Sequence, residues 1–411
     1  MEYVPRLVDE LLRKRVRTFP AVLVVGPRAV GKTTSARRIV RSVARLDVPR
    51  EAAAFEADAD VALASFEEPV LLDEWQVVPE VLGAVKRAVD EDPRPGRFVL
   101  TGSVRADLDA RAWPGTGRLV RVSLEPMVLS ERMRADLGAA RSRIDRLFDE
   151  GAGWLTGRRC SLGLDDHLEA ALAGGWPQLL GLEHQDRVAW LASYVDQLIT
   201  RDAQLVDGGR DPDRLRAWLR AYAATVATVT DDRSIYTSAG VAKATGESYG
   251  RLMEALLIAR PLPAWWTNEL KRLARRPKRH LVDAALLSVL LGMDARGALR
   301  TGSHGQILEA FVASQIRALL ATTREPTRAF HLRHLDGHEI DVVLERADRR
   351  LVAIEVKATA APRHDDVVHL RWLREVWGDR VAATLLAHTG PAAFDMGGGV
   401  IATPLGVLLG L

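Results

Sequence analysis

The chain lacks several features that would place it in a well-defined class. It has one cysteine, Cys160, in 411 residues, which excludes a framework of internal disulfides and fits a reducing compartment. Its longest apolar stretch, "LVDAALLSVLLG", contains Asp283 and is shorter than the roughly 20 residues that a membrane-spanning helix needs. No charged and then apolar leader opens the sequence. These absences predict a cytoplasmic protein without a membrane partner.

An excess of charge of one sign is also missing. The 57 basic and 54 acidic residues leave a net charge of +3, so composition by itself indicates no nucleic-acid partner, and any basic surface must be local. Only seven of the basic residues are lysines, an imbalance that a GC-rich coding bias explains. Two of the seven, Lys32 and Lys357, stand where specific chemistry requires an ammonium group.

The patterns that are present divide the chain into four regions. Because 47% of the residues are hydrophobic, several cores can be buried. Residues 1–130 alternate helical patterns with short apolar runs, which predicts a doubly wound parallel sheet; the runs lie at 21–25, 69–74, 97–103 and 118–126. Residues 131–212 indicate a helical lid, and residues 213–300 indicate a winged-helix segment. Residues 301–411 return to alternating helices and strands, so the expected fold class is α/β, with an N-terminal and a C-terminal α/β domain separated by the helical lid and the winged-helix segment.

A glycine-rich stretch follows the first expected strand and opens a helix. Its sequence, "GPRAVGKTT", satisfies the Walker A pattern G-x-x-x-x-G-K-[ST]. Its backbone N–H groups would approach phosphate oxygens, Lys32 would reach the β- and γ-phosphates, and Thr33 would ligate Mg²⁺. The alternative is a tight glycine turn without a ligand. The expected nucleotide-binding residues are Gly26, Pro27, Arg28, Ala29, Val30, Gly31, Lys32, Thr33 and Thr34.

Two later patterns extend this site. The Walker B-like stretch "VLLDE" ends in Asp73, which suits contact with Mg²⁺, and Glu74, which suits orienting and polarising the attacking water; a helix-capping acidic pair is the alternative. The next strand ends at Ser103, whose hydroxyl would sense the γ-phosphate. A positive charge opposite the transferring phosphoryl group is expected from Arg118 or Arg201, in the same chain or across the interface of a homo-oligomer. Together the patterns predict ATP hydrolysis.

The stretch "GHEIDVVLERADRRLVAIEVKAT" places acidic residues inside two apolar runs. Alternate residues of a strand share a face, so Glu355 and Lys357 lie side by side, and a turn at Asp348 would put Asp341 opposite Glu355. Neighbouring carboxylates repel each other unless a cation lies between them. We therefore expect Asp341 and Glu355 to ligate Mg²⁺ for phosphodiester cleavage, with Lys357 acting on a water and Glu309 completing the shell. The alternative is a surface hairpin in which Lys357 neutralises Glu355.

A basic run, "KRLARRPKRH", occupies residues 271–280 and follows Trp265 and Trp266. As a wing or a connecting strand it would contact phosphates, and the tryptophans would stack on bases. The alternatives are a solvated strip of arginines and tryptophans that pack beneath a wing.

Taken in chain order, these motifs resemble a large prokaryotic group of AAA-family P-loop ATPases. The resemblance rests on "YVPRLVDELL", "GPRAVGKTT", "LLDEWQVVPEVL", "FVLTGS", "GTGRLVRVSLEPMVLSE", "GGWPQLL", "YVDQLITRD" and "EIDVVLE…IEVKAT". Members of that group join an ATPase module to a C-terminal domain of unknown function, a half that looks like a winged helix plus a restriction-endonuclease-like PD-(D/E)XK fold. The resemblance implies a nucleotide site that includes Asp73 and Glu74 with Ser103 as sensor, and nuclease-type positions at Glu309, Asp341, Glu355 and Lys357.

The expected function is therefore ATP binding and hydrolysis coupled to action on nucleic acid, with DNA as the expected polymer and Mg²⁺ as cofactor. Nuclease activity of the C-terminal domain belongs to the same expectation. The alternative is an ATP-driven switch or defence-type regulator whose nuclease-like domain binds a partner without cutting it.

Overall fold

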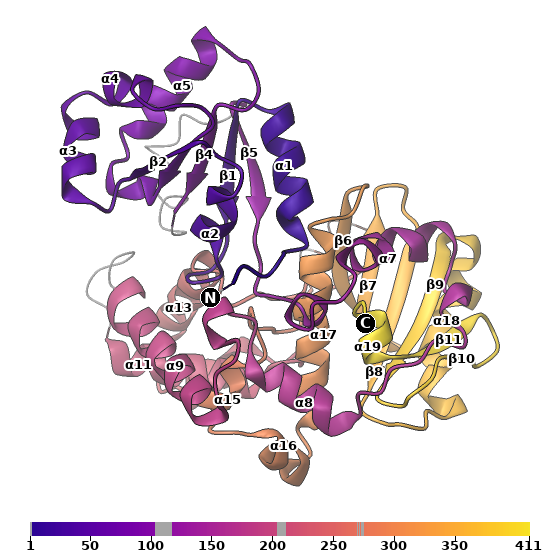
Figure 1. Cartoon of the computed structure of the whole chain (residues 1–411). Coiled ribbons are helices and arrows are strands. Elements are labelled where there is room, and N and C mark those ends of the chain that lie inside the picture. Colours follow the sequence, from indigo (N-terminus) through magenta and orange to yellow (C-terminus); the bar gives the residue numbers. More distant parts are fainter. Residues whose placement is uncertain (1, 103–116, 204–210, 269, 271, 273–274) are drawn as a thin grey trace.

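The computed structural model describes residues 2–102, 117–203, 211–268, 270, 272 and 275–411. Ser103, the expected γ-phosphate sensor, lies outside the described residues, as do three positions of the basic run. An N-terminal sheet with its helices, drawn in indigo and purple, lies above a helical region, and a C-terminal sheet in orange and yellow lies to one side (Figure 1). Within the described ranges, no helix combines the length and apolar character needed to cross a membrane.

The N-terminal region is a five-stranded, wholly parallel sheet with the strand order β2-β3-β4-β1-β5. Parallel sheets are buried on both faces, which explains why their strands read as short apolar runs. The strand β2 was not predicted, because "SVAR" has no such run. The strands are β1 (Ala21–Val25), β2 (Ser42–Arg45), β3 (Val70–Asp73), β4 (Phe98–Thr101) and β5 (Leu119–Ser123).

Alternation along β1 assigns the two faces of this sheet. Val22 and Val24 join the core that includes helix α1 (Val8–Thr18), whereas Ala21 and Leu23 join a separate core on the opposite face. That second core is covered by α3 (Pro49–Ala57), α4 (Ala59–Ala64) and α5 (Val81–Glu91). Helices therefore cover both faces, and the predicted doubly wound α/β architecture is confirmed.

The middle of the chain is helical and lies under the edge of the sheet that carries the P-loop (Figure 1). Between its helices at 243–255 and 286–290, two antiparallel bridges pair Ala259 with Leu281 and Leu262 with Lys278. The helices are α6 (Leu129–Arg132), α7 (Leu137–Asp149), α8 (Leu164–Ala173), α9 (His184–Gln197), η6 (Leu198–Asp202), α11 (Pro212–Ala224), α12 (Asp232–Ser238), α13 (Lys243–Ala255), α15 (Leu286–Leu290) and α16 (Ala295–Thr301).

The C-terminal region is a six-stranded mixed sheet with the order β10-β11-β9-β8-β7-β6. Strands β6, β7 and β8 are antiparallel neighbours, and β8, β9 and β11 are parallel. Two of the strands, β7 and β8, are the predicted pair; β6 was missed because its apolar residues are interrupted by arginine and histidine. The elements are α17 (His304–Leu320), β6 (Thr327–Arg333), β7 (Glu339–Arg346), β8 (Leu351–Lys357), α18 (Val368–Trp377), β9 (Val381–His388), β10 (Phe394–Asp395), β11 (Val400–Pro404) and α19 (Leu405–Leu408).

The helix α7 packs against this C-terminal sheet, although the sequence placed it in the helical lid. Arg346 on β7 lies 2.7 Å from the carboxylate of Asp149 at the end of α7. Arg143 of the same helix donates a hydrogen bond to the carbonyl of Val407, and Arg159 forms an antiparallel bridge with Ala392. Residues 137–160 thus belong, by packing, with the C-terminal sheet.

Candidate functional site

The P-loop joins β1 to helix α2 (Lys32–Arg37), and its two motif glycines are required for different reasons. Gly31 has a φ of +95°, in the left-handed region that side chains other than glycine rarely adopt. A Cβ on Gly26 would collide with the carbonyl oxygen of Leu124, so that residue must be glycine for the loop to pass. The backbone of the loop therefore curves along one side of a cavity.

Lys32 lies across this loop with its ammonium buried. Its Nζ donates to the carbonyl oxygens of Gly26 and Pro27, both at 2.9 Å. Burial lowers the pKa of Lys32 to about 8, although the nearby charge of Glu74 acts in the opposite direction. Burying the Lys32 ammonium therefore costs desolvation free energy, which a polyphosphate beside it would offset.

Thr33 and Asp73 meet at the start of α2, as the predicted magnesium site requires. The Thr33 hydroxyl donates to Asp73 Oδ1 at 2.8 Å, and the Thr101 hydroxyl donates to the same oxygen at 2.6 Å. Asp73 and Thr101 come together because β3 and β4 are parallel neighbours in the sheet and the two residues lie opposite each other. Oxygen donors of this kind suit Mg²⁺, so the residues fit that ion.

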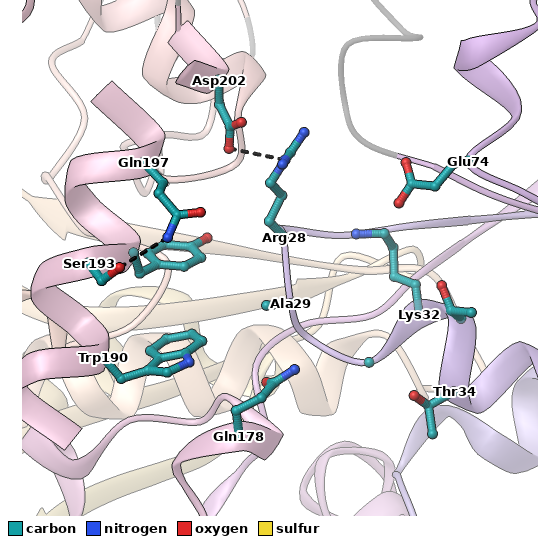
Figure 2. A pocket seen from close by; sticks show the side chains of 13 residues that line it. Arg28, Ala29, Lys32, Thr34, Glu74, Gln178, Trp190, Ser193, Gln197 and Asp202 are labelled. Carbon is teal, nitrogen blue, oxygen red and sulfur yellow. Dashed lines mark hydrogen bonds and ion pairs between the residues drawn. The ribbon is translucent and has the colours of Figure 1, made fainter. Parts of the chain in front are cut away.

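Glu74 follows β3 with a φ of +54°, which is unusual for a side-chain-bearing residue. Its carboxylate accepts a hydrogen bond from the Gln76 side-chain amide. Figure 2 shows its side chain facing the same space as Lys32. The local backbone conformation therefore brings Glu74 to the cavity, as expected of a residue that orients a water.

The cavity beside the P-loop has a volume of about 520 Å³, within the range of small-ligand sites. Six of the predicted nucleotide-binding residues line it: Arg28, Ala29, Gly31, Lys32, Thr33 and Thr34. Val30 is fully buried instead, with its carbonyl bound by Arg6 at 2.8 Å. The opposite wall comes from η5 (Pro177–Leu179) and α9, and the sequence did not predict it; its residues are Gln178, Trp190, Ser193, Tyr194 and Gln197.

An ion pair joins the P-loop to the helical region across one end of the cavity. Arg28 Nε lies 3.0 Å from Asp202 Oδ2, and Figure 2 shows the two side chains pointing toward each other. Burial raises the pKa of Asp202, which the charge of Arg28 partly offsets. The indole of Trp176 also donates to the carbonyl of Arg28 at 3.0 Å. The sequence did not predict Asp202 as a site residue, although it directly follows Arg201, a predicted catalytic residue.

The two predicted catalytic arginines do not line this cavity. Arg118 directly precedes β5, whose register pairs Leu119 with Ala21 at the start of β1, so it lies at the sheet edge opposite the P-loop. It pairs there with Asp90 at 2.8 Å. This contradicts a role for Arg118 in its own chain's pocket and leaves only the role across an interface as a prediction. Arg201 is exposed beside Asp202, and its role stays a prediction.

A second cluster of charged groups lies in the C-terminal sheet, where the predicted register is confirmed. Val342 is opposite Ile354, so the next pair is Asp341 and Glu355. The Val356 N–H donates to Asp341 Oδ2 at 2.9 Å, and Lys357 Nζ donates to Glu355 Oε1 at 2.8 Å. Burial and then the charge of Asp341 raise the pKa of Glu355 to about 8.

Lys278 is the residue of this cluster that sequence reasoning misplaced. Its side chain is 1% exposed, and its Nζ lies 2.8 Å from Glu309 Oε1, 3.0 Å from Asp341 Oδ1 and 3.3 Å from Glu339 Oε1. Burial alone would lower the pKa of Lys278, but these carboxylates outweigh it and raise that pKa. This member of the basic run therefore faces protein carboxylates rather than phosphates. Because lysine is scarce in this chain, the sequence offers the same reason to single out Lys278 as Lys32.

In the part of the chain that the structure describes, no group of three or more histidine, cysteine, aspartate or glutamate side chains is arranged to hold a metal ion. Metal ligation by Asp341 and Glu355 thus stays a prediction, as do the catalytic roles of Glu309 and Lys357.

The tryptophans before the basic run differ in position. Trp265 is 1% exposed and packs edge-on against Trp377, with ring centroids 5.2 Å apart, so it belongs to the core. Trp266 is half-buried and stacks on His334 at 5.1 Å, with the Arg275 guanidinium 3.6 Å above its ring. Only Trp266 presents a ring near the surface.

Three family models match the chain in succession. One described as "AAA domain" matches residues 18–133, a "Domain of unknown function (DUF8612)" matches 164–297, and a "Domain of unknown function (DUF4143)" matches 304–408. Among curated proteins, "Uncharacterized protein Rv2008c" of Mycobacterium tuberculosis and "Uncharacterized protein Mb2031c" of Mycobacterium bovis are each 30% identical over 407 residues, which is 97% of this chain and 83% of theirs.

Among solved structures, the Walker-type ATPase PABY2304 of Pyrococcus abyssi aligns with a TM-score of 0.41 and 14% identity. The alignment covers 69% of this chain and 94% of that chain.

Proposed function

The chain belongs to the family of AAA-type P-loop ATPases that carry a C-terminal DUF4143 domain, and we propose that it uses ATP hydrolysis to act on nucleic acid, with DNA as the polymer. The observation that carries the ATPase half is the single cavity at which Lys32, Thr33 and Glu74 meet, with Asp73 hydrogen-bonded to Thr33 at 2.8 Å.

The residues of the cavity divide the chemistry between them. Lys32 and the loop N–H groups would bind the phosphates and fix them in line with the attacking water. Mg²⁺ held by Thr33 and Asp73 would neutralise charge on the β- and γ-phosphates. Glu74 would orient the water and accept its proton as the new bond to the γ-phosphorus forms and the bond to the β-phosphate oxygen breaks.

Action on nucleic acid is supported by three features of the C-terminal half. The helices α11, α12 and α13 are followed by the antiparallel bridges Ala259–Leu281 and Leu262–Lys278, an order that a winged helix would have. The rings of Trp266 and His334 stack near the surface, and Arg275 lies over Trp266. Stacked rings beside arginine suit a single-stranded or flipped base.

One experiment tests both halves of the proposal: ATP turnover by the wild type and by Lys32→Ala, each alone and with single- or double-stranded DNA or RNA. We expect wild-type turnover to rise with DNA and Lys32→Ala to lose turnover with its circular dichroism spectrum unchanged. Retained turnover in a folded Lys32→Ala would contradict the ATPase site. Turnover that no polymer changes would contradict the nucleic-acid partner and leave the ATPase intact.

A second candidate is favoured by the position of Lys278. In it, the protein is an ATP-driven switch or regulator whose C-terminal domain binds a partner without cutting it. The support is that a lysine ammonium already contacts the carboxylates that a nuclease would use for its metal.

A further inference from the structure

The position of Lys278 is set by its backbone rather than by a flexible side chain. Its N–H donates to the carbonyl of Leu262 at 2.9 Å, and its carbonyl accepts from the Leu262 N–H at 2.8 Å. The residue therefore belongs to the antiparallel pair of the middle region, and its side chain extends from there into the C-terminal domain. Glu309 on α17 and Asp341 on β7 receive it.

The carboxylate oxygens that a metal would need are already engaged. Asp341 Oδ1 accepts a hydrogen bond from Lys278 Nζ, and Asp341 Oδ2 accepts one from the Val356 N–H. Glu355 Oε1 is bonded to Lys357. In the described residues around the cluster, the buried carboxylate oxygens without a hydrogen-bond partner are Glu309 Oε1 and Glu355 Oε2. Glu309 Oε1 lies 2.8 Å from the Lys278 ammonium, and Glu355 Oε2 by itself does not make a magnesium site, which takes near-octahedral oxygen ligation at about 2.0–2.1 Å.

The charges lead to the same conclusion. Glu309, Asp341 and Glu355 are nearly buried, whereas the Glu339 side chain is 41% exposed and screened by solvent. The three buried carboxyl groups face the ammonium groups of Lys278 and Lys357, so at most one negative charge is left uncompensated, and burial, which raises the pKa of Glu309 and of Glu355, favours less than that. A divalent ion would overcompensate that charge while also lying against the Lys278 ammonium. The predicted metal on Asp341 and Glu355 therefore does not fit beside Lys278.

We propose that Lys278 is the resident cation of the C-terminal acidic cluster: its ammonium takes the position of a divalent metal and fastens the middle region to α17 and β7. The cluster, as built, holds two regions of the molecule together and does not support metal-dependent cleavage. This inference does not depend on ATP hydrolysis.

Mn²⁺ is the probe that tests the assignment, because it binds carboxylate oxygens and its bound fraction is counted by electron paramagnetic resonance. The full-length protein is titrated without nucleotide as wild type, Asp341→Asn, Lys278→Met and the double variant. We expect the wild type and Asp341→Asn to bind the same number of ions. Lys278→Met should bind one more, and the double variant should lose it again. A wild-type ion that disappears in Asp341→Asn would overturn the proposal.

Thermal unfolding supplies an independent readout of the same variants. Lys278→Met should unfold at a lower temperature than the wild type, and Mn²⁺ should restore part of that loss only while Asp341 is intact. Arg276→Met is the matched control, since Arg276 belongs to the same basic run but pairs with Asp231 on the surface; it should match the wild type. Equal effects of Mn²⁺ on the wild type and Lys278→Met would overturn the assignment.

If Lys278→Met does not fold, the comparison of the wild type with Asp341→Asn still decides the question. Nicking of supercoiled DNA by the wild type with Mg²⁺ or Mn²⁺, absent in Asp341→Asn, would also overturn the proposal, and no nicking in either supports it.

Discussion

Lys32 carries its positive charge at a cost, because its ammonium is buried against two loop carbonyls. Burial lowers the pKa of Lys32 to about 8, so the free protein loses that charge as the pH rises through this value. Bound phosphates favour the ammonium form and raise the pKa again. Nucleotide binding and protonation of Lys32 are therefore linked: above the free-state pKa, binding must take up a proton.

The linkage predicts how ATP affinity depends on pH. With a free-state pKa of about 8, the affinity for ATP with Mg²⁺ should be about tenfold weaker at pH 9 than at pH 7. Calorimetry at several pH values measures it, and two buffers of different ionisation enthalpy report the proton taken up. Lys32→Arg is the control, because a guanidinium stays protonated over this range and should give a flat profile. A flat profile in the wild type would contradict the assignment.

At the scale of elements, the stretch "GGWPQLL" connects the sheet to the helical region. The Met127 N–H donates to the Gly175 carbonyl at 2.6 Å, and the Gly175 N–H donates to Asp283 at 2.9 Å. The indole N–H of the next residue, Trp176, donates a hydrogen bond to the carbonyl of Arg28 in the P-loop. A glycine is needed because a Cβ on Gly175 would lie 2.5 Å from the Met127 carbonyl oxygen.

Gly175→Ala should therefore destabilise the protein. Backbone has to move to make room for the methyl group, which costs about 1–3 kcal/mol in overpacked sites. Chemical denaturation monitored by tryptophan fluorescence measures the loss. Gly305→Ala is the matched control, because nothing lies within 4 Å of its Cβ position on α17; it should be neutral or stabilising by up to about 1 kcal/mol. Equal stabilities of the two variants would contradict the close approach at Gly175.

At the scale of the whole molecule, the C-terminal sheet is completed by a helix from far upstream. Ile144, Leu147 and Phe148 of α7 are at most 1% exposed and join the same core as Leu385 and Val352 of the sheet. The ion pair between Arg346 and Asp149 lies beside this contact. The family boundary near residue 304 is therefore not a boundary in packing.

A fragment of residues 301–411 should consequently fail to fold as an independent unit. It would expose the apolar sheet face that α7 covers, and an exposed surface of that kind promotes association. Size-exclusion chromatography and thermal melts followed by circular dichroism provide the measurement, with a fragment of residues 134–411, which retains α7, as the control. A monomeric 301–411 that melts as cooperatively as the longer fragment would show that α7 is dispensable.

The sequence alone determined the features that depend on neighbours along the chain. The P-loop needs only contiguous residues with particular backbone freedom, so the sequence alone assigns Gly26, Gly31, Lys32 and Thr33 to it, and their contacts with a nucleotide stay a prediction. The opposition of Asp341 and Glu355 was also predicted, because a short hairpin turn sets strand register locally. The apolar runs indicated the parallel sheet, because strands buried on both faces have to be apolar.

Only the tertiary structure decided what distant segments contribute. It placed Asp202 and the α9 side chains opposite the P-loop, Arg118 at the wrong edge of its sheet, and Lys278 among the C-terminal carboxylates. None of these follows from local pattern, since strand order and helix docking are set by which apolar faces bury each other over long separations. A charged residue has the same sequence signature on a solvated surface and in a buried ion pair, and only packing distinguishes the two.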